Sequence, residues 1–163
     1  MRAASAFTRF TLIGLIILSL GACSHNKPKT DEGLPTSEAI ENTMGDSDSG
    51  KAMGLQTIHF GYDAYTLDDT AKGILDSNTQ ILKDHGSLKI QIEGHCDQRG
   101  GIQYNIALGE KRANTVKHFL EGKGVGKDRI TTISFGKERP VDTGSTDEAY
   151  AKNRRANFSI TAK

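Results

Sequence analysis

The sequence has little of several features that mark common classes of protein. It has no excess of either charge, with 21 Lys and Arg against 20 Asp and Glu in 163 residues, so no basic field would attract nucleic acid. It has only two cysteines, and at most one disulfide could form between them. No apolar run approaches the roughly 20 residues of a membrane-spanning helix. What remains is enough chain for one compact domain with appendages.

The first 22 residues have the pattern of an export signal. Two arginines precede the apolar run FTLIGLIILSL, which ends in the small residues of GAC. The stretch LGAC resembles the bacterial lipobox, in which the chain is cut before a cysteine that carries lipid, although an ordinary thiol near a cleavage site remains an alternative. Ser24 is not the aspartate that retains many bacterial lipoproteins in the inner membrane. We therefore expect an outer-membrane lipid anchor at Cys23, with the rest of the chain in the periplasm.

Composition divides the rest of the chain at residue 55. Residues 23–54 are rich in Ser, Gly, Asp and Pro and contain few large apolar side chains. Such a segment buries too little surface to offset its chain entropy. We expect a flexible tether at 23–54 and a folded domain at 55–163.

Hydrophobic periodicity predicts an α/β, two-layer sandwich for this domain. Alternating patterns indicate strands with one buried and one solvated face, and helical spacing of apolar residues indicates amphipathic helices. We expect a small mixed four-stranded sheet with both helices on one face. The strands are expected at 55–60, 87–94, 129–136 and 155–162, the helices at 67–85 and 104–121, and one further helical turn at 147–153.

The second predicted helix has an arginine in the middle of its apolar face. At about 100° per residue, Arg112 shares that face with Leu108 and Val116. An unpaired buried charge is too costly, so the guanidinium needs a partner, and Asp97 in the preceding loop is the nearest candidate. The pair could be an internal salt bridge. It could also grip a zwitterion, with an ammonium at Asp97 and a carboxylate at Arg112.

Several motifs resemble those of a known family. EGHCDQRGGIQYNIALGEKRANTVKHFL is similar to the signature of the OmpA-like C-terminal domain, and GKGV, ISFGKERP and AYAKNRRANF continue it in order. The resemblance covers roughly residues 55–160. With the lipobox and tether, the chain resembles the lipoproteins of this family that associate with peptidoglycan. The family implies a non-catalytic domain, without a cofactor, that binds the peptidoglycan stem peptide at meso-diaminopimelate.

The resemblance also implies site residues and partners. The motifs GHCD, GEKRAN, FGYD, DQR and YNIAL place the stem-binding residues at Asp97, Arg112, Tyr62, Asp63, Arg99, Asn105 and Leu108. Implied partners are peptidoglycan, a TolB-like periplasmic protein and other Tol components. An OmpA-like lipoprotein outside the Tol system is the main alternative. The wall-anchoring domain of a motor stator fits less well, because a stator needs a spanning helix.

Other chemistry has weaker support. Adjacent His95 and Cys96 suggest a base and a nucleophile, but neighbours on an extended segment point in opposite directions and no third member is evident. The glycines of DQRGGIQ lack the lysine and hydroxyl of a phosphate loop. We therefore expect no enzyme, and we expect Cys96 to be a packing residue where relatives have Thr or Ala. No paired ligand spacing supports a metal site among His95, Cys96, Asp97, His59, His85 and His118.

Overall fold

The computed structural model describes residues 44–163. The predicted signal peptide, the lipid-bearing Cys23 and the tether up to residue 43 lie outside the described residues. In order, the elements are β1 (Ile58–His59), α2 (Asp69–Asp84), β2 (Lys89–His95), α3 (Ile102–Gly122), a short 3-10 helix (Lys127–Arg129), β3 (Ile130–Gly136), α4 (Asp147–Asn153) and β4 (Arg155–Ala162).

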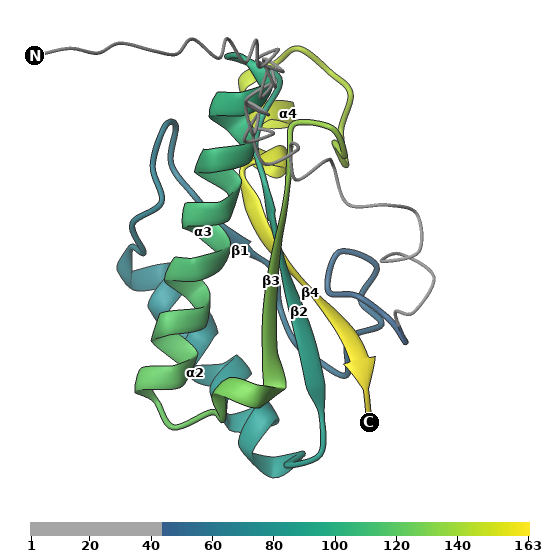
Figure 1. The fold of residues 1–163 in the computed structure, drawn as a ribbon. Coiled ribbons are helices and arrows are strands. Elements are labelled where there is room, and N and C mark those ends of the chain that lie inside the picture. Colours follow the sequence, from purple (N-terminus) through teal and green to yellow (C-terminus); the bar gives the residue numbers. More distant parts are fainter. Residues whose placement is uncertain (1–43) are drawn as a thin grey trace, which may run out of the picture. The chain divides into compact units, whose positions relative to one another are not determined.

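The four strands form one mixed sheet in the order β1-β4-β2-β3. Strands β2 and β3 are parallel, whereas β4 runs antiparallel to both of its neighbours, β2 and β1. Helices α2 and α3 lie on the same side of the sheet (Figure 1). The predicted two-layer α/β sandwich is confirmed, and so is the helical turn before the last strand. Strand β1 is shorter than predicted, because only two of its residues pair with β4.

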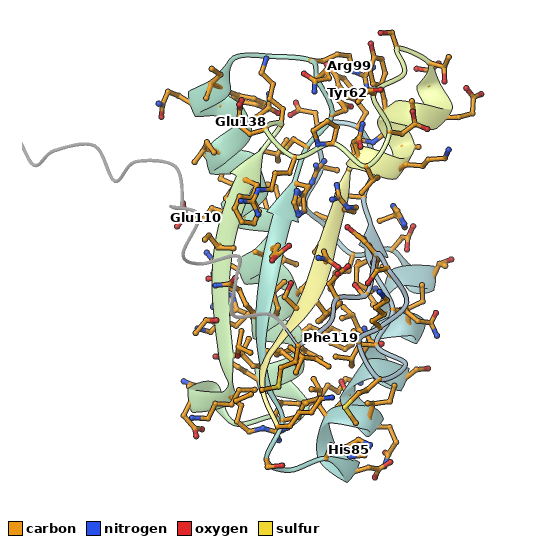
Figure 2. The ribbon with its side chains drawn as sticks, turned by 90° about the vertical axis from the view of Figure 1, so that its right-hand side faces the viewer. Tyr62, His85, Arg99, Glu110, Phe119 and Glu138 are labelled. Atoms are coloured by element: carbon orange, nitrogen blue, oxygen red, sulfur yellow. The ribbon has the colours of Figure 1, made fainter. Side chains whose placement is uncertain are left out.

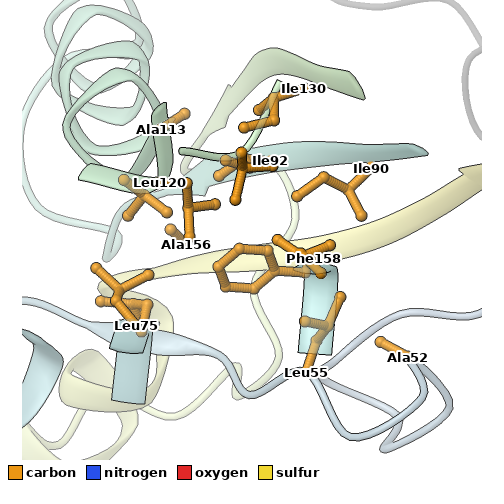
Figure 3. Packing of buried hydrophobic residues seen from close by; sticks show 14 of the residues in the cluster. Ala52, Leu55, Leu75, Ile90, Ile92, Ala113, Leu120, Ile130, Ala156 and Phe158 are labelled. Carbon is orange, nitrogen blue, oxygen red and sulfur yellow. The ribbon is translucent and has the colours of Figure 1, made fainter. Parts of the chain in front are cut away.

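The core lies between the helices and the sheet. Ile90, Ile92 and Phe158 from the central strands pack against buried side chains of both helices (Figure 3). Two glycines let α3 approach β2 closely, since a Cβ on Gly94 would lie 1.9 Å from the carbonyl oxygen of Gly109. This contact brings the first half of α3 onto the carboxyl end of β2.

The second face of the sheet differs from the prediction of a solvated surface. Glu93 is buried there and accepts hydrogen bonds from Asn157 Nδ2 at 2.9 Å and Ser159 Oγ at 2.7 Å. His95 is buried beside it and stacks on Phe135 with 5.5 Å between ring centroids. Glu93, Asn157 and Ser159 are satisfied by one another on this face, so the alternating pattern did not mark exposure to water.

The domain also begins earlier than residue 55. The backbone N–H of Met44 donates to Ile160 O at 2.7 Å, and that of Ser47 donates to Phe158 O at 2.9 Å. Ala52 is fully buried in the core. Residues 44–54 therefore extend the pairing along the edge of β4 instead of belonging to the tether. Their polar side chains are used as partners by the domain, as in the 2.7 Å hydrogen bond from Ser47 Oγ to Asn157 Oδ1.

Candidate functional site

The described chain has a cavity of about 200 Å³ at the carboxyl end of β2. The walls come from the loop after β1, the loop between β2 and α3, the first half of α3 and the residue before β4. Tyr62 and Arg99 mark this end of the molecule in Figure 2, opposite His85. The lining residues are Tyr62, Asp63, Cys96, Asp97, Arg99, Gly100, Tyr104, Asn105, Leu108, Arg112 and Arg154. All seven residues suggested by sequence resemblance thus surround one cavity.

Arg112 forms the floor of this cavity and is fully buried. Its guanidinium donates to three carbonyl oxygens, two on the loop after β1 and one at the end of β2: Ala64 O (2.8 Å, from Nε), Gly61 O (3.1 Å, from Nη2) and His95 O (2.7 Å, from Nη1). A fourth contact joins Nη1 to the sulfur of Cys96 at 3.5 Å. A guanidinium has five N–H donors, so these four contacts leave one on Nη2. Arg112 therefore fixes the loop after β1 to the end of β2, and one of its N–H groups has no partner among residues 44–163.

The predicted salt bridge between Arg112 and Asp97 is wrong. Within residues 44–163, no carboxylate lies within 4 Å of the Arg112 guanidinium. Burial lowers the pKa of Arg112, and nearby Arg154 adds to the effect, while the charges of Asp97 and Asp63 oppose it only in part. The helical periodicity correctly placed Arg112 on the buried face, but its partners are backbone carbonyls, which have no signature in the sequence.

Asp97 is held by two other arginines. Its carboxylate accepts from Arg99 Nη2 at 2.6 Å and from Arg154 Nη1 at 3.4 Å. Burial raises the pKa of Asp97, but hydrogen bonds from Arg99 outweigh burial, with a smaller contribution from Arg154, and the net pKa is lowered. Asp97 is thus an anion at neutral pH. With Asp63, the cavity has two carboxylates against the three guanidiniums of Arg99, Arg112 and Arg154, an excess of one positive charge.

The guanidinium of Arg99 lies between two tyrosine rings. Its Cζ is 4.1 Å from the ring centroid of Tyr62 and 4.6 Å from that of Tyr150. This position is favourable because the faces of aromatic rings attract cations. The Arg99 side chain is nevertheless 36% exposed, against 15% for that of Arg154. Of the two partners of Asp97, Arg99 is the one with room to move.

The remaining predicted residues shape the cavity in different ways. Asn105 donates its amide to Arg99 O at 2.8 Å and Gly101 O at 3.1 Å, which closes the loop before α3. Leu108, buried on the next turn, gives an apolar wall. Asp63 has a positive φ of 51° and accepts a hydrogen bond from the hydroxyl of Tyr104. Asp63 is exposed, so a ligand entering the cavity would meet its charge first.

Sequence reasoning missed two polar residues of the cavity, Arg154 and Tyr104. Arg154 follows α4, and its Nε also donates to Phe60 O at 3.1 Å. Strand alternation was a usable signal in the motif NRRANF, because adjacent Arg154 and Arg155 must point to opposite faces. Arg155 does point away, and its Nε donates to Asp48 Oδ2 at 2.7 Å.

His95 and Cys96 also point in opposite directions. Cys96 Sγ lies in the cavity wall and donates to Asn105 O at 3.3 Å. Burial raises the pKa of this thiol to about 11. The ring of His95 lies on the second face of the sheet, where neither nitrogen has a hydrogen-bond partner. Across residues 44–163, no cluster of three His, Cys, Asp or Glu side chains is arranged to hold a metal ion.

The fold and the cavity define an α/β ligand-binding domain, and comparison with known proteins identifies its family. Residues 59–154 match the OmpA family. The peptidoglycan-associated lipoprotein of Pasteurella multocida is 35% identical over 149 residues, 91% of this chain and 95% of that protein. The peptidoglycan-associated lipoprotein of Haemophilus influenzae is also 35% identical, over 92% of this chain and 95% of that protein. The chain therefore belongs to the OmpA family.

Solved structures agree with this assignment. The crystal structure of the peptidoglycan-associated lipoprotein from Burkholderia pseudomallei superimposes with a TM-score of 0.61 at 37% identity, over 66% of this chain and 89% of that one. The C-terminal domain of Helicobacter pylori MotB has a TM-score of 0.63 at 18% identity, over 68% of this chain and 87% of that one. The second likeness shows a shared fold alone.

Proposed function

We propose that the domain binds the peptide stem of peptidoglycan without chemical conversion and, with a lipid on Cys23, tethers the outer membrane to the cell wall. The observation that carries the proposal is the buried Arg112 at the floor of a cavity with an excess of one positive charge. The relatives named as peptidoglycan-associated lipoproteins, matched over nearly their full length, support the same conclusion.

The ligand group proposed for this cavity is the side chain of meso-diaminopimelate, which ends in an ammonium and a carboxylate on one carbon. The carboxylate would accept the spare N–H on Nη2 of Arg112. The ammonium would meet Asp97, which is ionised at neutral pH because its pKa is lowered. Arg99 is the partner of Asp97 that would shift to make room, since Arg154 is the more buried of the two. Leu108 would pack against the methylene groups of the side chain.

Binding by this route needs no reaction step. The thiol of Cys96 is protonated at neutral pH, with its pKa raised to about 11. His95 lies on the other face of the sheet and cannot accept a proton from Cys96. The residues available in the cavity bind and orient charged groups, and we assign them no role in catalysis.

The proposal is tested by sedimentation with purified sacculi. The mature chain from residue 23, with Cys23→Ser so that no lipid is attached, should sediment with sacculi that contain diaminopimelate. Soluble diaminopimelate stem peptide should release it in a concentration-dependent manner. A chain that stays in the supernatant, or that the peptide does not release, would refute stem binding.

The anchor and the Tol partners are proposed separately. Within residues 44–163 no helix is long and apolar enough to cross a membrane. Mass spectrometry of the mature protein tests the anchor, because an unmodified N-terminus, or one upstream of Cys23, contradicts it. We also infer a role in the Tol–Pal system with a TolB-like partner, which rests on the resemblance of the lipobox, the tether and the domain motifs to the lipoproteins of this family. Failure of the folded domain to bind the TolB-like protein of the same organism would favour a wall-binding lipoprotein outside that system.

A further inference from the structure

Two tyrosines at the mouth of the cavity present ring faces that the proposed contacts of Arg112 and Asp97 with the stem side chain do not use. Tyr62 is 65% exposed and Tyr104 is 55% exposed, yet both line the cavity. They come from separate segments, the loop after β1 and the first turn of α3. Exposed aromatic rings gathered at a cavity mark a contact surface. We call this pair the tyrosine rim.

Both rings of the tyrosine rim are held in place before any ligand arrives. The hydroxyl of Tyr104 donates to Asp63 Oδ1, and the ring of Tyr62 has one face against the guanidinium of Arg99. The outer faces remain open to solvent. The second carboxylate oxygen of Asp63 has no hydrogen-bond partner among the described residues. The rim thus offers flat apolar faces beside a free acceptor, and the Tyr104 ring, which Asp63 holds, is presented at little entropic cost on binding.

This chemistry suits a sugar ring. The face of an aromatic ring is electron-rich, and one face of a pyranose presents weakly positive C–H groups with hydroxyls around its edge. Stacking would place the C–H groups on a tyrosine ring and bring a hydroxyl within reach of Asp63. A flexible acidic or basic peptide would use the charge of the rim but gain little from its flat faces.

The covalent structure of peptidoglycan places a sugar near this position. Only two residues separate diaminopimelate from the muramic acid to which the stem is attached. An extended chain spans at most about 3.3–3.6 Å per residue, so these two residues alone allow a separation of up to about 7 Å, and the diaminopimelate side chain, the γ-linked glutamate and the lactyl ether of muramic acid lengthen that reach. We propose that Tyr62 and Tyr104 form a glycan subsite that binds the amino sugar carrying the stem. This inference rests on the proposed function and extends it from the peptide to the glycan strand.

The test compares two soluble ligands by calorimetry, with the mature Cys23→Ser chain. One is the free stem tetrapeptide with meso-diaminopimelate, and the other is the same stem attached to its disaccharide. In the wild type the disaccharide should improve affinity roughly fivefold to tenfold, as expected for one aromatic stacking contact. The ratio of the two affinities is compared within each variant, so a loss common to both ligands cancels.

Three variants locate the effect. Tyr104→Ala should bring the ratio close to one, while Tyr104→Phe should keep most of it, because the ring remains. Tyr65→Ala is the matched control, since Tyr65 is 43% exposed on the same loop as Tyr62 but does not line the cavity. Should Tyr104→Ala not fold, Tyr62→Ala provides the same comparison from the other segment.

The outcomes separate this inference from the proposed function. Tight stem binding with a wild-type ratio of one overturns the glycan subsite, leaves stem binding intact and favours a protein partner for the rim. A ratio that Tyr104→Ala and Tyr62→Ala leave unchanged also overturns it. If neither ligand binds to the folded wild type, the proposed function fails and the subsite fails with it.

Discussion

Arg112 shows how a buried charge can be stabilised without an ion pair. Hydrogen bonds to a charged group contribute about 1.5–3 kcal/mol each, and the three carbonyl partners of Arg112 lie on the loop after β1 and at the end of β2. Arg129 has the same chemistry at the opposite end of the sheet. It donates to Leu82 O, His85 O and Leu88 O at 2.7–2.9 Å. The two arginines therefore form a natural pair for comparison.

The first prediction uses that pair. Arg112→Lys keeps the charge but cannot reach three divergent carbonyls, so the free energy of unfolding should fall by about 2–4 kcal/mol. Stem binding should be weakened as well. Arg129→Lys should destabilise the domain by a similar amount and leave stem affinity unchanged at a temperature where the variant is folded. Urea titrations and calorimetry measure both quantities. Equal loss of binding in the two variants would mean that Arg112 acts through stability alone.

Cys96 gives the second prediction, that its thiol packs and does not react. Its pKa of about 11 leaves almost no thiolate at pH 8. Alkylation by iodoacetamide at pH 8 should therefore be slow in the native protein and fast in urea. Cys96→Ala should cost about 1 kcal/mol and preserve wall binding. Rapid native labelling, or a folded Cys96→Ala variant that no longer binds sacculi, would reopen the question of chemistry at this position.

These residues show where sequence reasoning reached its limit. The position of Arg112 on a buried face followed from helical spacing, and the membership of the cavity followed from motif resemblance. The hydrogen-bond partners of Arg112 did not follow from the sequence. A helical wheel gives the direction of a side chain, but it does not show which backbone segment lies opposite that side chain in the fold. Asp97 was the carboxylate of the loop before the helix, yet Arg99 and Arg154 are its partners in the fold.

At the scale of elements, α3 positions the cavity through its contact with β2. A Cβ on Gly109 would lie 2.3 Å from Ser134 Oγ and 2.9 Å from Gly94 O. Helix propensity favours alanine over glycine by about 1 kcal/mol, but here the steric conflict is larger. The close approach of helix and strand is what places Arg112 beneath the loop carbonyls.

The third prediction follows from this contact. Gly109→Ala should lower the free energy of unfolding by about 2 kcal/mol or more and weaken stem binding, because α3 must move away from β2. Gly73→Ala in α2 is the matched control, since nothing lies within 4 Å of its added Cβ. That variant should be more stable by about 0.5–1 kcal/mol and bind normally. Thermal melts of both variants decide the matter, and a stable Gly109→Ala variant would contradict the steric argument.

Most elements were predicted to within a few residues, while the character of the second sheet face was not. The alternating pattern located β2 and β4 in the sequence and identified their core-facing residues. The polar residues that alternate with the core-facing ones were assigned to solvent, because the sequence of a strand does not show which other segment covers its second face. In the fold, Glu93, Asn157 and Ser159 bond to one another, and residues 44–48 close the edge beside them.

This polar face makes stability depend on pH, the fourth prediction. Burial lowers the pKa of His95, and nearby Arg155 adds to the effect, while Glu93 and Asp48 oppose it. Since the folded pKa lies below the unfolded value of about 6.5, the unfolded state binds the proton first as pH falls. Stability should therefore decrease as pH drops below about 6.5.

Urea titrations between pH 8 and pH 5 measure this dependence. His95→Phe should flatten the curve over that range, whereas His118→Gln, at an exposed position of α3, should not. Glu93 titrates separately. Burial raises its pKa, but hydrogen bonds from Ser159 and Asn157 and the nearby His95 lower it overall, so its contribution disappears only as pH falls below about 4.5. A wild-type curve that is flat from pH 8 to 5 would contradict the role of His95.

At the scale of the whole domain, the cavity and the point of chain entry lie at opposite ends of the sheet. Met44 pairs with Ile160, which lies opposite Ile90 at the start of β2, whereas the cavity follows the end of β2 at His95. At about 3.3 Å per residue the two points are roughly 16 Å apart along the strand. If the membrane holds one end and the wall the other, tension would act first on the pairing of residues 44–47 with β4, which joins the anchor side of the chain to the sheet.

The last prediction concerns which type of peptidoglycan stem the domain binds. A stem with lysine in place of diaminopimelate keeps the ammonium for Asp97 but lacks the carboxylate for Arg112. The Arg112 guanidinium already has three carbonyl partners, so the loss should lie near the lower end of the usual range for a truncated buried charge pair. We expect about 2 kcal/mol, or roughly a thirtyfold weaker affinity.

Calorimetry with the two matched stem peptides measures this discrimination. Arg112→Lys should bind both peptides weakly, since a point charge does not reproduce the planar fork. Asp97→Asn should weaken both by a similar factor, because both retain the ammonium, and should therefore preserve their ratio. Equal affinity of the wild type for the two peptides, or undiminished binding by the folded variants, would leave Arg112 with a structural role alone. Selectivity for a diaminopimelate wall would then have to come from contacts outside the cavity, with the glycan strand as the first place to look.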